Sequence, residues 1–309
     1  MLFRNCDYFV AIVEAGSLTK AAEVLYVSQP SLSQYLKRLE RKLGVELFDH
    51  SVSPLQLTYT GERYYQYVLR ERQLEENLRK EFQDIHSEIR GKLRLGVALW
   101  RSSCLLPDVF PSFHQQYPDI RLELYEARSD QLEMALMNDK IDIAVMNLPH
   151  TLDYAKLNSE TIFEEQIVLA APTEHPAIRE ALAEASYLDG YPVISLDILK
   201  QIPLILTKPG QNLTHEVRHT LGKNHIEPDI LLETGNLTTA INLVAKGMAC
   251  VFVPDEGAKV CRRPDEVTYF TLGIPDLVWN LSAVYRKDVY LPKISRLFID
   301  NMKQQIGGA

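Results

Sequence analysis

One segment of the chain, SQPSLSQYLKRLERKLG at residues 28–44, combines an apolar helical stripe with an opposite edge that can hydrogen-bond to nucleic acid. With 100° of rotation per residue, Leu36, Leu39 and Leu43 fall within about 40° of Leu32. The opposite edge holds no carboxylate, and its side chains are of the types that contact base edges and phosphates. We therefore interpret it as a DNA-reading edge rather than a solvated charged face. Its members are Pro30, Ser31, Ser33, Gln34, Lys37, Arg38 and Arg41.

We expect the residues on this edge to make two kinds of contact, to base edges and to phosphates. Gln34 and Ser33 are predicted to hydrogen-bond to base edges. Lys37, Arg38 and Arg41 are predicted to hold phosphates. The complete set of residues that we predict to bind DNA is Ser17, Thr19, Ser28, Gln29, Pro30, Ser31, Ser33, Gln34, Lys37, Arg38 and Arg41.

A second pattern, THEVRHT, matches the HExxH spacing of zinc hydrolases. On a helix, His215 and His219 would share a face and could bind zinc, with Glu216 as the general base. A catalytic zinc needs a third protein ligand, and none follows in a recognisable motif. Val217 and Leu221 also fit an ordinary amphipathic helix. We therefore expect no catalytic residue and no metal, with a metalloprotease, or a structural or regulatory metal, as the alternatives.

Length, composition and charge are those of a multidomain globular protein. The chain has 309 residues, of which 46% are hydrophobic and 24% charged, which suggests about two domains. No stretch approaches the ~18 apolar residues of a membrane helix, and no secretory signal is recognisable. A transport-type solute-binding protein is therefore disfavoured. Of the net charge of −8, most lies beyond residue 90, and the basic cluster from Lys37 to Lys42 can still meet phosphate.

Three short helices predicted near the N-terminus would position the reading edge. Ala21 and Ala22 allow two of these helices to cross closely, as a helix-turn-helix requires. Ser28 is a predicted N-cap, and Pro30 occupies the first turn, where its missing N–H does no harm. Free N–H groups at this helix start, beside Ser28 and Ser31, can also bind phosphate.

The next two segments predict a wing and a long helix. Residues 47–61, LFDHSVSPLQLTYTG, are typical of two short strands around a turn. Residues 60–90 contain no proline, and after Gly61 no glycine, which predicts a long exposed helix. Its apolar residues recur at gaps of three and four, so the stripe requires a partner helix. The stripe consists of Leu74, Leu78, Phe82, Ile85 and Ile89.

From residue 91 onward, short apolar runs alternate with helical segments. The predicted buried strands are KLRLGVAL, IRLELYEA, IDIAVMNL, EEQIVLAAP, IPLILT and ACVFVP. The predicted helices are 103–117, 130–139, 212–223 and 236–247. This alternation predicts a parallel sheet with helices on both faces, and the length of the region suggests two lobes.

The N-terminal motifs resemble the winged helix-turn-helix of LysR-type transcriptional regulators. The run FVAIVEAGSLTKAAEVLYVSQPSLSQYLKRLERKLGVELF, followed by LTYTG, is similar to that family at many fixed spacings. A long helix followed by a two-lobed α/β domain is also similar to the family. The matching residues are Gly16, Ser17, Ala21, Ala22, Ser28, Gln29, Pro30, Ser31, Ser33, Leu39, Glu40, Leu43, Gly44, Leu47, Phe48, Leu57, Thr58 and Gly61.

The resemblance implies a multidomain fold. An all-α winged helix-turn-helix would span 1–59, a linker helix would span 60–90, and an α/β effector domain resembling periplasmic binding proteins would span 91–309. Lobe I would comprise 91–162 and 267–309, and lobe II 163–266.

The resemblance also implies a function. The chain would be a bacterial, cytoplasmic transcription regulator and not an enzyme. It would read an interrupted inverted repeat in double-stranded DNA as a homodimer or homotetramer. A small-molecule effector would control it, RNA polymerase is a further expected partner, and we expect no membrane partner and no cofactor.

The wing departs from the family pattern. The family usually keeps an arginine shortly after the Leu-Phe pair, but this place holds His50, preceded by Asp49. No lysine or arginine occurs from 43 to 62. We therefore expect DNA binding to depend more on the recognition helix than on the wing.

The effector cleft of the family lies between the lobes, and ligands in open α/β sheets bind beyond the carboxyl ends of the strands. Residues that follow the predicted strands are therefore candidate ligand contacts. Arg101, Arg128 and Lys208 would favour a carboxylate or another anion. Ser102 and Ser103 are expected to begin a helix and to offer N–H groups. The predicted effector-binding set is Arg101, Ser102, Ser103, Arg128, Ser129, Asn147, Thr207, Lys208 and Gln211.

The four cysteines, Cys6, Cys104, Cys250 and Cys261, are widely spaced and form no CxxC pair. This spacing indicates neither a zinc knuckle nor a redox pair, and four cysteines suit a reducing cytoplasm. Cys104 would lie beside the cleft, which leaves a redox sensor as an alternative. We interpret it as a buried, inert thiol.

Overall fold

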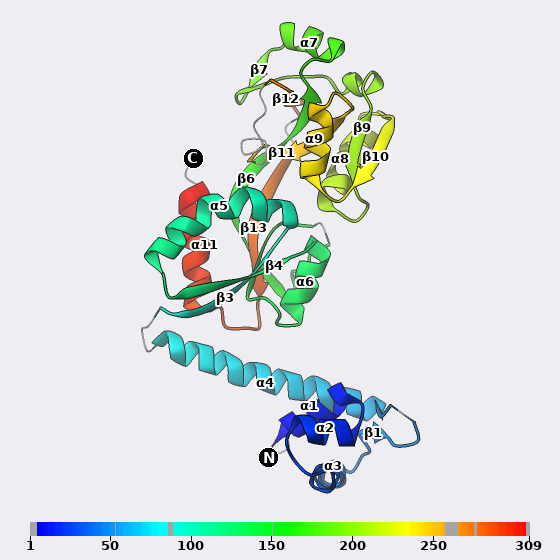
Figure 1. Cartoon of the computed structure of the whole chain (residues 1–309), viewed down its shortest axis with the longest axis vertical. Coiled ribbons are helices and arrows are strands. Elements are labelled where there is room, and N and C mark those ends of the chain that lie inside the picture. The colour runs from blue at the N-terminus through cyan, green and yellow to red at the C-terminus, as the bar shows by residue number, and fades with distance from the viewer. Residues whose placement is uncertain are drawn as a thin grey trace. The chain divides into compact units, whose positions relative to one another are not determined.

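The computed structural model describes residues 5–52, 54–85, 89–149, 151–256, 265–274 and 277–306. The chain forms two compact units, Met1–His86 and Ser87–Ala309 (Figure 1). The boundary between them lies near the predicted start of the effector domain at residue 91. Among the described helices, none is both long enough and apolar enough to cross a membrane.

Three helices at the N-terminus form as predicted, and their apolar faces make the core of the first unit. Ser28 caps the third helix by accepting a hydrogen bond from the Ser31 N–H at 3.4 Å. Ala21 and Ala22 are buried where the second helix crosses its neighbours. The helices are α1 (Cys6–Ala15), α2 (Leu18–Val24) and α3 (Gln29–Leu43).

The predicted wing forms as an antiparallel pair, β1 (Phe48–Asp49) and β2 (Gln56–Leu57). Glu40 of α3 ties the wing to the helix, because its Oε1 accepts hydrogen bonds from the N–H groups of Leu47 at 2.8 Å and Phe48 at 3.4 Å. Helix α3 and the first strand of the wing are therefore joined directly.

The predicted linker helix is α4 (Tyr59–Ile85), which begins directly after the wing. Three residues of the predicted stripe are exposed on it: Leu74 at 67%, Leu78 at 48% and Phe82 at 54%. The Ile85 side chain lies outside the described residues. Ile89 was predicted on the same stripe, but it follows the end of α4 and packs against the core of the second unit.

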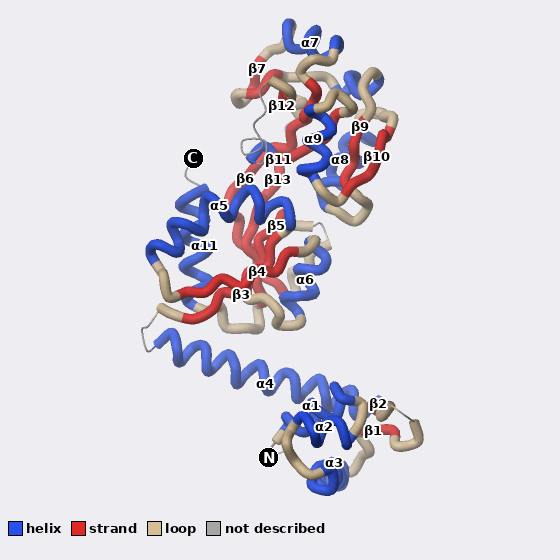
Figure 2. Tube along the Cα trace, in the orientation of Figure 1, coloured by secondary structure: helices blue, strands red, loops and turns tan. Residues whose placement is uncertain are grey.

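The second unit is built on one nine-stranded sheet, whose order is β10-β9-β11-β6-β13-β5-β3-β4, with β12 also pairing β6 (Figure 2). The strands are β3 (Gly91–Val97), β4 (Ile120–Glu126), β5 (Ile143–Asn147), β6 (Leu157–Pro172), β9 (Leu204–Thr207), β10 (Ile230–Thr234), β11 (Cys250–Pro254), β12 (Val267–Phe270) and β13 (Val278–Arg286). A separate hairpin pairs β7 (Tyr187–Leu188) with β8 (Tyr191–Pro192). The helices are α5 (Leu99–Gln116), α6 (Ser129–Met137), α7 (Pro176–Ala183), the 3-10 helix η1 (Leu196–Lys200), α8 (Asn212–Lys223), α9 (Leu237–Ala245) and α11 (Lys293–Ile306).

The sheet is mixed, whereas the sequence analysis predicted a parallel one. Strand β3 pairs in parallel with β4 and β5, and β9 does so with β10 and β11. Strands β6 and β13 run antiparallel to their neighbours. Strands β6 and β13 break the parallel pattern because the long strand β6 continues from one lobe into the other, and β13 returns alongside it.

Strand pairing also places the return of the chain to lobe I later than the predicted residue 267. Residues 157–166 of β6 pair with β13, and residues 167–172 pair with β11 and β12. Strand β12 was assigned to lobe I with residues 267–309, but its partners place it in lobe II. The chain therefore returns to lobe I between β12 and β13.

Helices cover both faces of the lobe I sheet, as predicted. Ile143 and Val145 of β5 join the core beneath α5 and α11, whereas the alternate residues Ala144 and Met146 join the core beneath α6. This period of two is that of a strand buried on both faces. In lobe II, α8 and α9 pack on the sheet through a single large core.

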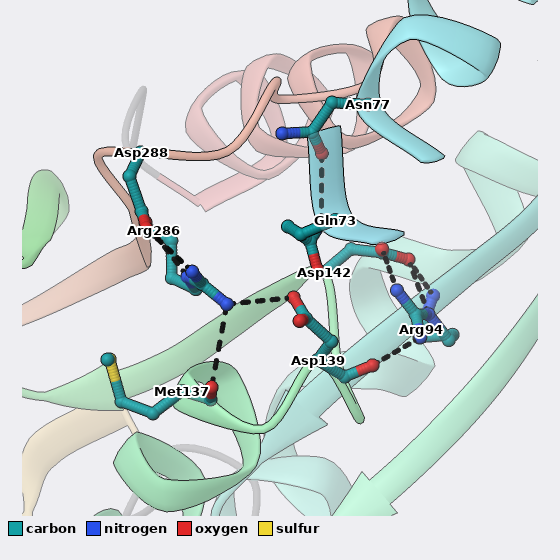
Figure 3. Close-up of polar contacts among 8 residues, drawn as sticks. All are labelled: Gln73, Asn77, Arg94, Met137, Asp139, Asp142, Arg286 and Asp288. Atoms are coloured by element: carbon teal, nitrogen blue, oxygen red, sulfur yellow. Dashed lines mark hydrogen bonds and ion pairs between the residues drawn. The ribbon is translucent and has the colours of Figure 1, made fainter. Parts of the chain in front are cut away.

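Ion pairs hold the loop between α6 and β5 in lobe I (Figure 3). Arg94 of β3 binds Asp142 through two bonds, Nη2 to Oδ1 at 2.6 Å and Nε to Oδ2 at 3.2 Å. Arg286 of β13 donates from Nη1 to Oδ1 of Asp139 at 3.0 Å. The loop is therefore fixed to two strands of the sheet.

A second charged cluster attaches α11 to lobe I. The Glu160 carboxylate accepts hydrogen bonds from Arg296 at 2.6 and 2.7 Å, from Lys303 at 3.1 Å and from the Tyr285 hydroxyl. Burial alone would raise the pKa of Glu160, but the bonds from Arg296, Tyr285 and Lys303 outweigh it and lower the pKa to about 2.

We expect Glu160→Gln to lower the free energy of unfolding at pH 7 by about 2 kcal/mol, after a reduction for solvent screening at this partly exposed site. A lowered folded pKa stabilises the protein above the unfolded value of 4.5, and this contribution disappears as pH falls towards 2. Urea unfolding at pH 7 and pH 3 should therefore show a smaller difference between wild type and variant at pH 3. Glu180→Gln, at an exposed carboxylate of α7, is the control, and an equal loss from it would contradict the assignment.

Candidate nucleic-acid interface and effector cleft

Helix α3 buries one edge and exposes the other. Leu32, Leu36 and Leu39 are buried in the core of the first unit, and Leu43 is half-buried. The opposite edge is exposed, except for Ser33, which is half-buried. The exposed members of the predicted set on this helix are Gln29, Pro30, Ser31, Gln34, Lys37, Arg38 and Arg41.

The other predicted contacts lie at helix starts. Ser28 is exposed, and its hydroxyl lies 2.8 Å from that of Ser31, so the two hydroxyls form a polar pair at the start of α3. Thr19 is exposed on α2 and Ser17 is half-buried as its N-cap residue. The structure thus places all eleven predicted residues on α2, α3 or their caps. Their roles in DNA binding remain a prediction.

The sequence analysis did not single out Tyr26, which occupies the turn between α2 and α3. Its side chain is 96% exposed, and its φ of 54° lies in the left-handed region. A bulky residue seldom adopts this conformation. The signal in the sequence was a large aromatic residue at a turn position that favours glycine or asparagine.

In the second unit, a cavity of about 240 Å³ lies where the carboxyl ends of β3, β4, β5, β9, β10 and β11 meet. The first residues of α5, α6, α8 and α9 line it as well. Helix N-termini carry partial positive charge and unpaired N–H groups. The lining residues are Ala98, Leu99, Trp100, Arg101, Ala127, Arg128, Ser129, Asn147, Thr207, Gln211, Asn212, Leu213, Gly235, Leu237, Pro254 and Trp279.

Six of the nine predicted effector contacts line this cavity, and three do not. Ser102 was predicted to begin a helix and to offer its N–H group to a ligand. Instead, α5 begins at Leu99, and the Ser102 N–H bonds to the Ala98 carbonyl at 2.9 Å. Ser103 lies on the same turn, and its side chain is exposed. Lys208 is exposed one residue beyond Thr207 and outside the lining. The six that line the cavity are Arg101, Arg128, Ser129, Asn147, Thr207 and Gln211.

A buried network forms part of the cavity wall. Arg101 is 3% exposed and donates from Nη2 to Glu165 and, at 3.0 Å, to Oδ1 of Asn147. Asn147 in turn donates to Oε1 of Glu165 at 2.8 Å. Burial raises the pKa of Glu165, while Arg101 and Asn147 act in the opposite direction. The network joins α5 and β5 to the strand that connects the lobes.

The two arginines of the cavity that were predicted to attract an anion already form ion pairs with carboxylates. Arg101 pairs with Glu165, and Arg128 pairs with Asp130 at 2.6 Å in an exposed position. The N-terminal ends of the four helices at the cavity therefore add to these paired cations in favouring an anion there.

Four residues in or beside the cavity were not in the predicted effector-binding set. Asn212 spans the lobes, because its Nδ2 donates to the Asn147 carbonyl at 2.8 Å and to the Ser129 hydroxyl at 3.3 Å. Trp100 and Trp279 both line the cavity. Glu165 lies in the network below it. The available signal was composition, since the chain has only two tryptophans.

The alternative chemistries find little support in the geometry. His215 and His219 are exposed on α8. Across the described residues, no group of three or more His, Cys, Asp or Glu side chains is arranged to hold a metal. Cys104 is buried, and burial raises the pKa of Cys250 to about 12, which disfavours a reactive thiolate. Cys261 lies outside the described residues.

Comparison with known proteins assigns both units. Residues 3–62 match the model of the bacterial regulatory helix-turn-helix protein, lysR family. Residues 86–307 match the LysR substrate binding domain, which is most of the chain. This protein belongs to the LysR family of transcriptional regulators.

Relatives of this LysR-type regulator match it over most of its length. The Hca operon transcriptional activator HcaR of Escherichia coli (strain K12) is 30% identical over 82% of each chain. The HTH-type transcriptional regulator BsdA of Bacillus subtilis (strain 168) is 28% identical over 97% of this chain and 99% of its own. These domains and relatives are those of a regulator and not of an enzyme.

Solved structures share the fold of this LysR-type regulator. A full-length OxyR variant from Pseudomonas aeruginosa superimposes with a TM-score of 0.70 at 22% identity, over 97% of this chain and 93% of its own. HinK, a LysR family regulator from Pseudomonas aeruginosa, gives a TM-score of 0.60 at 25% identity, over 99% and 98%. The predicted fold class, a winged helix-turn-helix followed by a two-lobed α/β domain, is confirmed.

Proposed function

We propose that this LysR-type regulator reads double-stranded DNA with the exposed edge of α3 and that a small anionic effector in the cavity between the lobes controls it. The observation that supports DNA reading is the division of α3 into a buried leucine edge and an exposed edge without carboxylates. The wing holds no lysine or arginine, so α3 supplies the phosphate contacts as well as the base contacts.

The exposed stripe of α4 supports a dimer. Leu74, Leu78 and Phe82 lie at helical spacing and are largely exposed, so a partner helix would remove them from water. Two α3 helices related by a dyad would read half-sites about 34 Å apart, as an interrupted inverted repeat. Effector domains would join dimers into a tetramer, and RNA polymerase is a further proposed partner. Such a regulator acts on the chromosome, so we place it in the cytoplasm.

The effector role of the cavity is supported by its position between the lobes. Asn212 of lobe II hydrogen-bonds to Asn147 and Ser129 of lobe I, so these bonds link the two lobes beside the cavity. A ligand that contacts both lobes would shift the balance between open and closed forms. It must bind one form better than the other, because equal binding to both changes nothing.

We expect Gln34→Ala to relax base preference. Loss of a base-edge hydrogen bond should lower affinity for the specific site by about tenfold or more and leave affinity for scrambled DNA nearly unchanged. Gel shifts on both DNAs measure the ratio. If both affinities fell by the same factor, Gln34 would not read a base.

We expect Arg38→Ala to weaken binding to all sequences alike. Each lost phosphate contact lowers the slope of log K against log salt by about 0.9, or by about twice that for a dimer with two helices. A salt series of gel shifts measures the slope. Arg179→Ala removes the same charge from α7, outside the proposed interface, and should leave the slope unchanged. An unaltered slope for Arg38→Ala would remove Arg38 from the phosphate contacts.

A further inference from the structure

The cavity between the lobes has an aromatic and apolar wall. Both tryptophans of the chain, Trp100 and Trp279, line it. Leu99, Leu213 and Leu237 add aliphatic surface, and polar side chains complete the lining. Tryptophan offers a large flat surface to another ring, with a preference for offset or edge-to-face contact. The wall is therefore suited to a planar apolar body.

The size of the cavity limits that body to one ring. A cavity of 150 Å³ accommodates benzene, so about 240 Å³ leaves room for a single ring with a substituent of a few atoms. Acyclic metabolites of this size would fit by volume but would leave the indole surfaces without a matching flat partner.

Polar atoms in the wall of the cavity indicate which chemical group the ring of the ligand carries. The Nε and Nη2 atoms of Arg101 are bonded to Asn147 and Glu165. Its Nη1, like Nε1 of Trp100, is buried without a hydrogen-bond partner among the described residues. Buried donors without partners are costly. Neither atom has appreciable accessible surface in this structure, so a ligand reaches them only when the two side chains shift. A carboxylate has two acceptor oxygens and would then satisfy both donors.

The electrostatic setting also favours an anion, although Glu165 opposes it. Four helices, α5, α6, α8 and α9, begin at the cavity, and their N-terminal ends favour negative charge. Oε2 of Glu165 is likewise buried without a described partner. The guanidinium has five N–H donors in a planar fork, so Arg101 can bind Glu165 on one side and a second carboxylate on the other.

We infer that the effector is a monocyclic aromatic carboxylate. Its carboxylate accepts hydrogen bonds from Arg101 Nη1 and Trp100 Nε1 after these buried side chains turn toward the cavity, and its ring packs against Trp100 and Trp279. This inference rests on the proposed effector role of the cavity and adds the chemical class of the ligand.

Three matched probes separate charge from aromaticity in the full-length protein. Benzoate has both features, benzamide has the ring without the charge, and cyclohexanecarboxylate has the charge without the aromatic ring. Because both tryptophans line the cavity, their fluorescence reports binding directly, and thermal unfolding gives an independent measure. We expect benzoate to bind at least about tenfold more tightly than either analogue. Equal affinities, tighter binding of an analogue, or no response to benzoate at millimolar concentration would overturn the inference.

Two variants locate the site. Trp279→Leu should lower affinity for benzoate by about tenfold and change affinity for cyclohexanecarboxylate much less, because only the ring contact is lost. Ser129→Phe places a large side chain at the half-buried lining residue and should abolish the response to every probe. The unfolding temperature of each variant without ligand shows that it is folded.

The outcomes distinguish the ligand class from the effector role. If acyclic anions stabilise the protein and Ser129→Phe removes that effect, the cavity is an effector site and the aromatic class is wrong. If benzoate binds the wild type and the Ser129→Phe variant equally, the assignment to this cavity is wrong. If no small anion in a metabolite screen stabilises the protein or changes its affinity for DNA, the effector role itself is refuted.

Discussion

Arg101→Met is expected to lower the free energy of unfolding of the effector domain by about 3 to 5 kcal/mol, because it leaves the buried Glu165 carboxylate without its cation. Arg101 and Glu165 are almost entirely removed from solvent, with side chains 3% and 0% exposed. For a domain of this size, such a loss lowers the unfolding temperature by about 10 °C or more. Calorimetry of the full-length protein measures it.

The pH dependence identifies the charge as the cause. Burial already raises the pKa of Glu165 above its usual value, and removal of Arg101 raises it further. A raised folded pKa stabilises the folded state below the unfolded value, and this contribution is lost as pH rises through the folded pKa. The loss in free energy of unfolding caused by Arg101→Met should therefore be smaller at pH 5 than at pH 8.

A double variant provides the matched control. Arg101→Met combined with Glu165→Met removes both charges and fills the space with apolar side chains, so it should recover most of the stability lost by the single variant. If the double variant were as unstable as Arg101→Met, the loss would come from packing rather than from an unpaired charge.

Gly61→Ala is expected to destabilise the DNA-binding domain by about 3 kcal/mol and to weaken DNA binding. A Cβ atom at Gly61 would lie 1.9 Å from the carbonyl oxygen of Leu47 and 2.8 Å from its carbon. These are backbone atoms at the start of the wing, so a rotamer change cannot relieve the clash. The start of α4 would have to move away from the strand that Glu40 ties to α3.

Gly44→Ala is the matched control in the same domain. Gly44 caps α3 with a φ of 71°, and a Cβ there would meet nothing within 4 Å. The cost is then conformational only, about 1 kcal/mol. Chemical denaturation and gel shifts compare the two variants, and a larger loss for Gly44→Ala would contradict the steric account of Gly61.

The sequence by itself determined the fold of the N-terminal helix-turn-helix and its wing, because the signals for them are local. The helical period of the leucines, the Ser28 cap and the position of Pro30 all act within a few residues, and α3 begins and ends where they indicate. The wing was predicted from the turn residues between its two short strands. The exposed edge of α3 is the complement of the buried one, so its members could be named without a structure.

The carboxyl-end rule placed the cavity correctly because it is a rule of chain direction, which the order of strands and helices already contains. It selected Arg101, Arg128, Asn147, Thr207 and Gln211 at the ends of strands. It erred for Ser102 and Ser103 because α5 begins earlier than predicted. With α5 beginning at Leu99, the Ser102 N–H bonds to the Ala98 carbonyl within the helix and is no longer available to a ligand.

Only the tertiary structure decided what those residues meet. Glu165 lies 64 positions from Arg101, and Asn212 lies 65 from Asn147, so no local pattern predicts either contact. Trp279 reaches the cavity because β13 runs antiparallel beside β6, a pairing that the alternation of strands and helices does not contain. The burial of Arg101 and Glu165 and their pairing arise from long-range packing, which a local sequence pattern does not contain.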